Sequence, residues 1–299
     1  MKYFKMEASK LAERYIITAD SFQTATQHKF PFEQKTEHGN LSQYGLCPSC
    51  LNPIQLIGVS HTVKVSPHGK HTGKTITGLP DWKQQKYQYC PYARHSDYQA
   101  PDDQTLLPDI DQDIIALYDL LRDQFDRVVY IIQKDFHIRG TTALWREALR
   151  KYIINRVYCY PWLTEANLPY VFALRGMQQE KCWGQLFEIH SEIYDAISAH
   201  PNAAWADSGV KGYRRLKNKQ GSFLKLVFRL TDHVQKATDG EHLKESLLLC
   251  IDDNNTRKTI FRKKIEFDET YFTNLIRVDC SYRNQTLLDI AEQIMKPLL

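Results

Sequence analysis

The sequence predicts an α+β protein, because the spacing of apolar residues changes along the chain from a helical period to a strand period. From residue 108 to residue 198, apolar residues recur with the 3.6-residue period of helices, whereas after Pro201 they alternate with a period of two. Helices followed by strands indicate an α+β arrangement with a largely antiparallel sheet. Residues 1 to about 100 form a third zone, which is punctuated by Gly, Pro and His.

Five segments are expected to be helical, and the clearest spans residues 108–126. Ile114, Leu117, Leu121 and Phe125 follow the i, i+3, i+7, i+11 pattern of one helix face. The other expected helices cover residues 6–17, a segment that starts at Thr141 or Thr142, residues 186–198 and residues 285–295. Pro101 and Pro108 bound a stretch that is typical of a linker.

Three strands are expected after Pro201. Apolar and polar residues alternate from Leu224 to Thr231 and again from Phe261 to Phe267, as in half-buried strands. The short apolar run Leu247–Ile251 fits a central strand, and Asp239-Gly240 offers a turn before it.

The composition excludes several classes of protein. With 299 residues, 42% hydrophobic and 25% charged, the chain has ordinary globular proportions and a length of roughly two domains. No apolar run is longer than about five residues, whereas a membrane span needs about 20. The first ten residues contain no apolar region typical of a signal peptide. We therefore expect a soluble, cytoplasmic protein.

The sharpest chemical motif is Cys47-Pro48-Ser49-Cys50. Seven cysteines without a secretion signal argue against a disulfide framework, so closely spaced thiols are interpreted first as metal ligands. Two thiolates in a CxxC turn can bind one tetrahedral Zn²⁺, and Cys90 is the expected third ligand. We expect His71 as the fourth, because its glycine-flanked loop can fold over the CxxC turn; the alternatives are His61, His68 and His95.

The alternative for this motif is a metal-free or thioredoxin-like CxxC pair. A redox pair requires the motif at the start of a helix, and Asn52-Pro53 argues against one here. No HxE motif accompanies Cys90, so a structural zinc is favoured over a catalytic one. Residues 1–104 are thus expected to form a zinc-stabilised module, followed by an α+β domain at residues 105–299.

Charge is strongly segregated although the net charge is only +4. Residues 97–126 hold nine acids against Arg122 alone, and residues 209–229 hold seven cations without an acid. The second segment begins with a glycine-rich stretch, residues 209–221, which is typical of a loop. Local fields of this kind attract polyanions, whereas the acidic segment could engage a partner protein.

These cations predict binding to nucleic acid. Cations neutralise phosphates, and aromatic residues interleaved with them near Cys90 can stack on unpaired bases. The expected nucleic-acid-binding residues are Lys70, Lys74, Lys83, Lys86, Lys211, Arg214, Arg215, Lys217 and Lys219. A weaker signal is the outline of a helix-turn-helix across Arg127–Tyr152, although Val128–Ile132 could equally be a strand.

No signature of an enzyme is found. The sequence contains no GxGxxG, P-loop, GxSxG or HExxH motif. We therefore expect a non-enzymatic, zinc-containing nucleic-acid-binding protein of DNA-binding or RNA-binding type. One alternative is a metal-dependent nuclease, for which Asp252-Asp253 at a strand end could hold a metal ion. The other is a protein-interaction adaptor that uses the acidic segment and has no affinity for nucleic acid.

Overall fold

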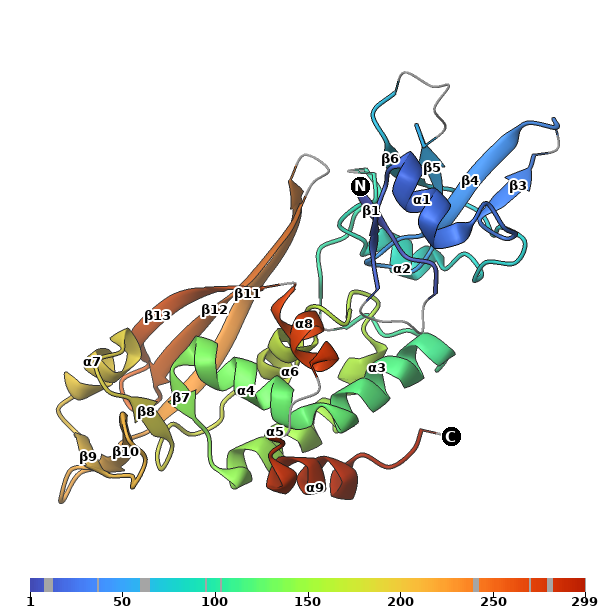
Figure 1. Cartoon of the computed structure of the whole chain (residues 1–299). Coiled ribbons are helices and arrows are strands. Elements are labelled where there is room, and N and C mark those ends of the chain that lie inside the picture. Colours follow the sequence, from blue (N-terminus) through green and yellow to red (C-terminus); the bar gives the residue numbers. More distant parts are fainter. Residues whose placement is uncertain are drawn as a thin grey trace. The chain divides into compact units, whose positions relative to one another are not determined.

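The structure is a computed structural model (Figure 1), which describes residues 1–7, 13–36, 38–59, 65–94, 96–102, 104–238, 242–268, 270–278 and 282–298. Within these ranges helices occur together with antiparallel sheets, which confirms the α+β class. The chain forms two compact units. Unit 1 comprises residues 1–113, 160–165 and 235–244, and unit 2 comprises residues 114–159, 166–234 and 245–299.

Unit 1 is built on a sheet whose four strands have the order β3-β4-β5-β6, with antiparallel neighbours. The strands are β3 (Glu33–Lys35), β4 (Leu41–Leu46), β5 (Pro53–Ile57) and β6 (His68–His71). The other elements are β1 (Tyr3–Phe4), β2 (Tyr15–Ile16), α1 (Ala19–Thr26) and α2 (Gln84–Gln88). One core cluster of this unit includes Cys47, Cys50 and Cys90 beside Phe4 and Phe22.

Two expectations for this part of the chain need revision. The opening helix was placed at residues 6–17, but Tyr15–Ile16 form β2, which pairs with β1; residues 8–12 lie outside the described part. Residues 101–108 were expected to be a linker, yet they belong to unit 1. There Tyr89 Oη donates to Asp102 at 2.6 Å, and Leu107 is buried.

The helices of unit 2 confirm several periodicity predictions. They are α3 (Gln112–Asp123), which begins at the end of unit 1, α4 (Phe125–Phe136), α5 (Thr142–Ile154), α6 (Leu168–Gly176), α7 (Glu192–Ser198), α8 (Tyr271–Arg277) and α9 (Gln285–Ile294), with a short 3₁₀ turn at Val157–Cys159. Thr141 caps α5 as its Oγ1 accepts from the N–H of Leu144, and Asn284 caps α9 by the same geometry. The expected helices in residues 108–126, after Thr141 and at residues 285–295 are therefore present.

Unit 2 also contributes to two sheets. One has the strand order β7-β8-β10-β9, formed by β7 (Ile138–Arg139), β8 (Leu186–Glu188), β9 (Ala203–Asp207) and β10 (Tyr213–Asn218). The other has the order β11-β12-β13, formed by β11 (Leu226–Thr238), β12 (His242–Asp253) and β13 (Lys258–Glu266). The strands predicted at residues 224–231, 247–251 and 261–267 overlap β11, β12 and β13, whereas Asp239-Gly240 lies outside the described residues.

Three local predictions were wrong. Residues 186–198 are not one helix, because Phe187 pairs in β8 with Ile138 and Arg214 before α7 begins. The stretch 209–221 is not a loop throughout, since Tyr213–Asn218 form β10. Residues 128–132 are helical within α4, so the alternative that Val128–Ile132 form a strand was wrong, while the helix-turn-helix outline stays a prediction.

Candidate metal centre and basic surfaces

The four predicted metal ligands come together because neighbouring strands bring them to one end of the sheet. Cys47 and Cys50 lie in the turn between β4 and β5, which closes as Cys47 N–H donates to Asn52 O at 2.9 Å. His71 ends β6 and pairs with Ile54 of β5. Cys90 follows α2. The Sγ atoms and the histidine nitrogen all lie within 4.8 Å of one another.

The distances fit a tetrahedral ion. With Zn–S bonds of about 2.3 Å, two sulfurs on one zinc lie about 3.8 Å apart. Cys47 Sγ and Cys90 Sγ are 3.7 Å apart, and His71 Nε2 lies 3.3 Å from Cys50 Sγ and 3.8 Å from Cys90 Sγ. The cluster could therefore hold one metal ion.

The electrostatics of the cluster favour a cation. Burial raises the pKa of the Cys90 thiol well above its usual value, whereas at Cys47 hydrogen bonds from the other cysteines and the charge of His71 outweigh burial and lower the pKa. Burial also opposes charging of His71, but the Cys47 thiolate outweighs it and raises the pKa of His71 to about 10. A buried thiolate thus stabilises positive charge beside it.

Of the alternative histidines, the described part of the chain contains His68, which does not belong to this cluster. His68 lies on β6, where its Nδ1 is 2.8 Å from Ser66 O. His61 and His95 lie outside the described residues.

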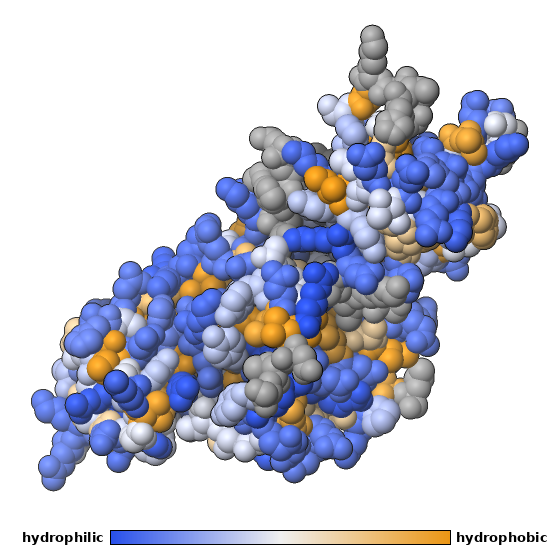
Figure 2. Space-filling view, in the orientation of Figure 1, coloured by the Kyte–Doolittle hydropathy of each residue, from blue (hydrophilic) through white to orange (hydrophobic). Residues whose placement is uncertain are grey.

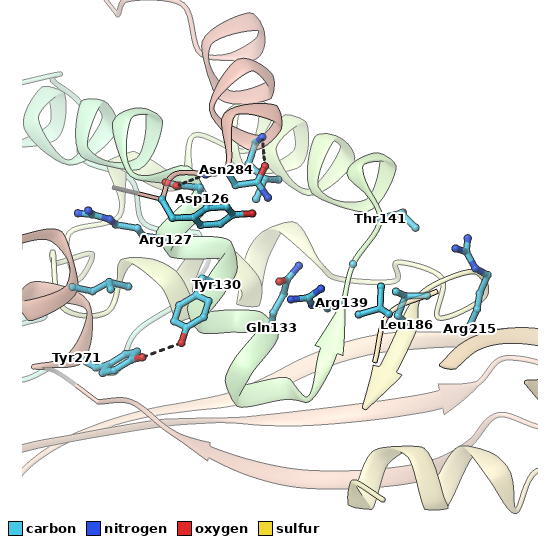
Figure 3. Close-up of a pocket in the computed structure, with 15 residues that line it drawn as sticks. Asp126, Arg127, Tyr130, Gln133, Arg139, Thr141, Leu186, Arg215, Tyr271 and Asn284 are labelled. Atoms are coloured by element: carbon cyan, nitrogen blue, oxygen red, sulfur yellow. Dashed lines mark hydrogen bonds between the residues drawn. The ribbon is translucent and has the colours of Figure 1, made fainter. Parts of the chain in front are cut away.

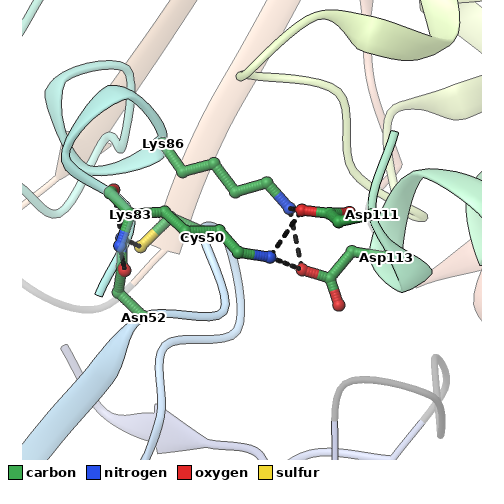
Figure 4. Close-up of polar contacts among 6 residues, drawn as sticks. All are labelled: Cys50, Asn52, Lys83, Lys86, Asp111 and Asp113. Carbon is green, nitrogen blue, oxygen red and sulfur yellow. Dashed lines mark hydrogen bonds and ion pairs between the residues drawn. The ribbon is translucent and has the colours of Figure 1, made fainter. Parts of the chain in front are cut away.

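Asn52 is a contact of the cluster that sequence reasoning missed (Figure 4). Its Nδ2 donates to Cys50 Sγ at 3.4 Å and to Lys83 O at 3.0 Å, and its Oδ1 accepts from Lys83 N–H at 2.6 Å. Asn52 is buried, so it ties the cysteine turn to the segment that starts α2. The sequence signal for this contact was the position of Asn52, two residues after Cys50. In the sequence analysis it served only as an argument against a helix.

Lys83 and Lys86, which were expected to bind nucleic acid, are engaged within unit 1 (Figure 4). Lys83 Nζ lies 2.6 Å from Asp111 Oδ2 and 2.7 Å from Asp113 Oδ2, and Lys86 Nζ lies 2.9 Å from Asp113 Oδ2. Lys86 is buried. These two lysines neutralise carboxylates of the acidic segment, so we no longer assign them to a phosphate-binding surface. Lys70 and Lys74 are exposed and stay predictions.

Part of the basic stretch at residues 209–221 forms β10, whose side chains alternate between the two faces of the sheet. Leu216 of β10 is fully buried, so Arg215 and Lys217 project to the opposite face of the sheet. Arg215 pairs with Leu186, which pairs on its other side with Arg139 of β7. We call this side, with Arg139, Leu186, Arg215 and Lys217, the open face.

The cations of this stretch are not neutralised by the described part of the protein. Lys211, Arg214, Arg215, Lys217 and Lys219 form no ion pair with any described residue. Arg139 forms no ion pair with a described residue either, and its guanidinium lies 5.4 Å from the centroid of the Tyr213 ring. Figure 2 shows that the visible surface around α7, β9 and β10 is mostly hydrophilic, with apolar side chains scattered among polar ones.

Two cavities adjoin the open face. The first, which we call the arginine pocket, has a volume of about 590 Å³ and includes Arg127, Arg139 and Arg215 in its lining (Figure 3). The second, which we call the tryptophan cavity, has a volume of about 890 Å³ and is lined by residues that include Lys181, Trp183, Arg215 and Lys217. Thr141 and Arg215 line both, so the cavities meet on this side of unit 2.

Many acidic residues of the segment at residues 97–126 form ion pairs with other residues of the protein. Besides Asp111 and Asp113, Asp126 is held by Arg283 at 2.8 Å, and Asp119 and Asp123 both contact Arg122. The proposed carboxylate pair for a nuclease is also occupied: Asp252 accepts from Arg229, and Asp253 accepts from Thr256 at 2.7 Å. Among the described residues, the cysteine–histidine cluster is the one group of three or more potential ligands.

Comparison with known proteins gives no relative from which function could be inferred. No protein-family model, curated protein or solved structure matches the chain. Among the described residues, no helix combines the length and the apolar character needed to cross a membrane.

Proposed function

We propose that the chain is a zinc-containing nucleic-acid-binding protein, in which zinc stabilises unit 1 and the open face of unit 2 contacts the phosphates. The observation that carries the second part is the row Arg139–Leu186–Arg215, with Lys217 on the same face. These cations have no acidic partner among the described residues. Unneutralised cations on one face attract a polyanion and release its counterions on binding.

The metal is proposed to be zinc on the chemistry of its ligands. A set of three thiolates and one imidazole matches structural zinc sites, in which the protein supplies all four ligands. The ligands lie in the buried core beside Phe4 and Phe22, so an ion there would join the turn after β4, the end of β6 and the segment after α2 and would contribute to folding.

The composition of the tryptophan cavity supports nucleic acid as the anion. Trp183 is 52% exposed beside Lys181 and Lys217, and an exposed ring next to cations can stack on a base. Glu180 also lines this cavity, but its carboxylate is already paired with Lys151. Asp207 is the remaining acid in the lining.

The proposal is tested by a salt titration of wild type and a triple variant, Arg139→Gln/Arg215→Gln/Lys217→Gln. If all three contact phosphates, the slope of log K against log [salt] should flatten by about 2 for single strands and up to about 2.7 for duplex DNA. The control variant, Arg150→Gln/Lys225→Gln/Lys258→Gln, removes the same charge from exposed positions elsewhere in unit 2.

The control should keep a slope close to that of wild type. Equal slopes for wild type and the triple variant would remove the open face from the binding site. Absence of binding by wild type at about 50 mM salt would overturn the proposed function and leave the adaptor alternative.

A further inference from the structure

The arginine pocket is walled by several elements of unit 2, so it is a built cavity and not a shallow depression. Side chains of α4 line one side, α8 and the segment that leads into α9 line others, and β7, β8 and β10 supply the sheet edge. Figure 3 shows Arg139 and Gln133 near its centre, with Arg215 at one end and Tyr130 and Tyr271 towards the other. Its volume of about 590 Å³ lies within the range of small-ligand sites, about 300–1,000 Å³.

The lining of the pocket carries a net positive charge. Arg127, Arg139 and Arg215 contribute three guanidinium groups, and Asp126 is the one carboxylate in the lining. That carboxylate is already saturated: Arg283 Nε and Nη2 donate to it at 2.9 and 2.8 Å, and Asn284 N–H donates at 3.0 Å. The ligand of this pocket must therefore bring its own negative charge.

The tyrosines supply a different kind of contact. Tyr271 Oη and Tyr130 Oη lie 3.5 Å apart, and Tyr130 is 49% exposed. Tyr271 Oη donates to Tyr130 Oη, and this hydrogen bond raises the pKa of Tyr271 to about 12. Lys134 Nζ lies 3.8 Å from the centroid of the Tyr271 ring and covers one of its faces. The half-exposed ring of Tyr130 and the other face of Tyr271, near arginines, suit a ligand that combines a planar base, a sugar and a phosphate.

We infer that the arginine pocket binds a nucleoside monophosphate unit, with the phosphate monoester at Arg139 and the base towards Tyr130 and Tyr271. This inference rests on the proposed function for its biological source, namely the phosphorylated end of a strand that lies on the open face. A monoester carries about −1.5 to −2 charges, more than an internal phosphodiester, and arginine binds such groups through paired hydrogen bonds. Arg215 lines both cavities and is placed to contact the next phosphate of that strand.

The test compares four probes: a short single-stranded oligonucleotide with a 5′-phosphate, the same strand with a 5′-hydroxyl, the same strand with a 3′-phosphate, and free AMP. Wild type should bind one phosphorylated strand about tenfold or more tightly than the hydroxyl strand. Arg139→Gln should abolish that gain. Lys217→Gln, which changes the tryptophan cavity only, should weaken all strands and keep the gain.

The outcomes separate this inference from the proposed function. If wild type binds all strands equally and does not bind AMP, the pocket assignment is overturned, while salt-dependent strand binding still supports the open face. A gain that persists in Arg139→Gln also overturns the assignment. Binding of AMP that depends on Arg139, in a protein without affinity for strands, supports the pocket with a free nucleotide as its ligand and removes the proposed function.

Discussion

Arg139 and Arg215 lie on the same face of a four-stranded sheet because both pair with Leu186, one from each side of β8. Two strand spacings separate their backbones by about 10 Å. Because the two arginines come from different strands, we propose that each contacts a separate phosphate of the bound strand. The pairing register of three short strands therefore determines the geometry of the proposed site.

The register yields a prediction for two adjacent arginines. Arg215 projects to the open face, whereas Arg214 pairs with Phe187 and Asp207 on the opposite side. Arg215→Gln should weaken nucleic-acid binding about tenfold at low salt, because it removes a charge-assisted contact. Arg214→Gln, with the same change in charge, should leave the salt slope unchanged. Equal effects in a binding titration would show that net charge, and not the open face, determines affinity.

How far the sequence predicted the fold depends on where each element finds its partners. The helix after Thr141 and the one after Asn284 were predictable, because a capping side chain and an apolar face are both local signals. The sheet that contains β8 and β10 was not. Ile138, Phe187 and Arg214 pair across long stretches of sequence. β7 and β8 are too short to show alternation, and in β10 Leu216 is the one buried residue among polar ones.

The candidate sites show the same difference between local and long-range signals. A CxxC turn is a local motif, so Cys47 and Cys50 could be proposed from their spacing alone. The ion pairs of Lys83 and Lys86 could not be foreseen, because Asp111 and Asp113 lie more than 20 positions further along and no pattern links them. Counting cations in a segment without knowing their partners therefore overstated the basic surface of unit 1.

Metal content is the direct test of the cluster. Wild type should contain about one zinc ion per chain by elemental analysis, and Cys90→Ser should lose it and destabilise unit 1. The matched control is Cys182→Ser, which changes a fully buried cysteine of unit 2. That variant should keep its zinc and lose about 1 kcal/mol of stability. Retention of wild-type zinc by Cys90→Ser would rule out Cys90 as a ligand.

Asn52 is expected to tune the affinity for the metal. Its amide donates to Cys50 Sγ, and such outer contacts typically change affinity about 10–100-fold when removed. Asn52→Asp keeps an acceptor for Lys83 N–H but places a carboxylate beside the thiolate. Competition with a chelator should show weaker binding in this variant, while Gln55→Glu, on the neighbouring strand β5, should bind as wild type does. Identical affinities for Asn52→Asp and wild type would argue against this role.

The decrease in the free energy of unfolding at low pH should depend on Asp113. Burial by itself raises the pKa of this carboxyl, but the charge of Lys86 and the hydrogen bond from Lys83 outweigh it and hold the pKa below its ordinary value. Its contribution is therefore present above the unfolded pKa of about 3.9 and is lost as the pH falls through the folded pKa. Asp113→Asn should lower the free energy of unfolding by about 3 kcal/mol at neutral pH. In denaturant titrations, its stability should then fall less than that of wild type between about pH 5 and pH 2, because the titrating group is gone.

Asp81→Asn is the control, since Asp81 is exposed and forms no ion pair with a described residue. Parallel stability curves for wild type and Asp113→Asn would show that the lysine–aspartate cluster does not stabilise unit 1.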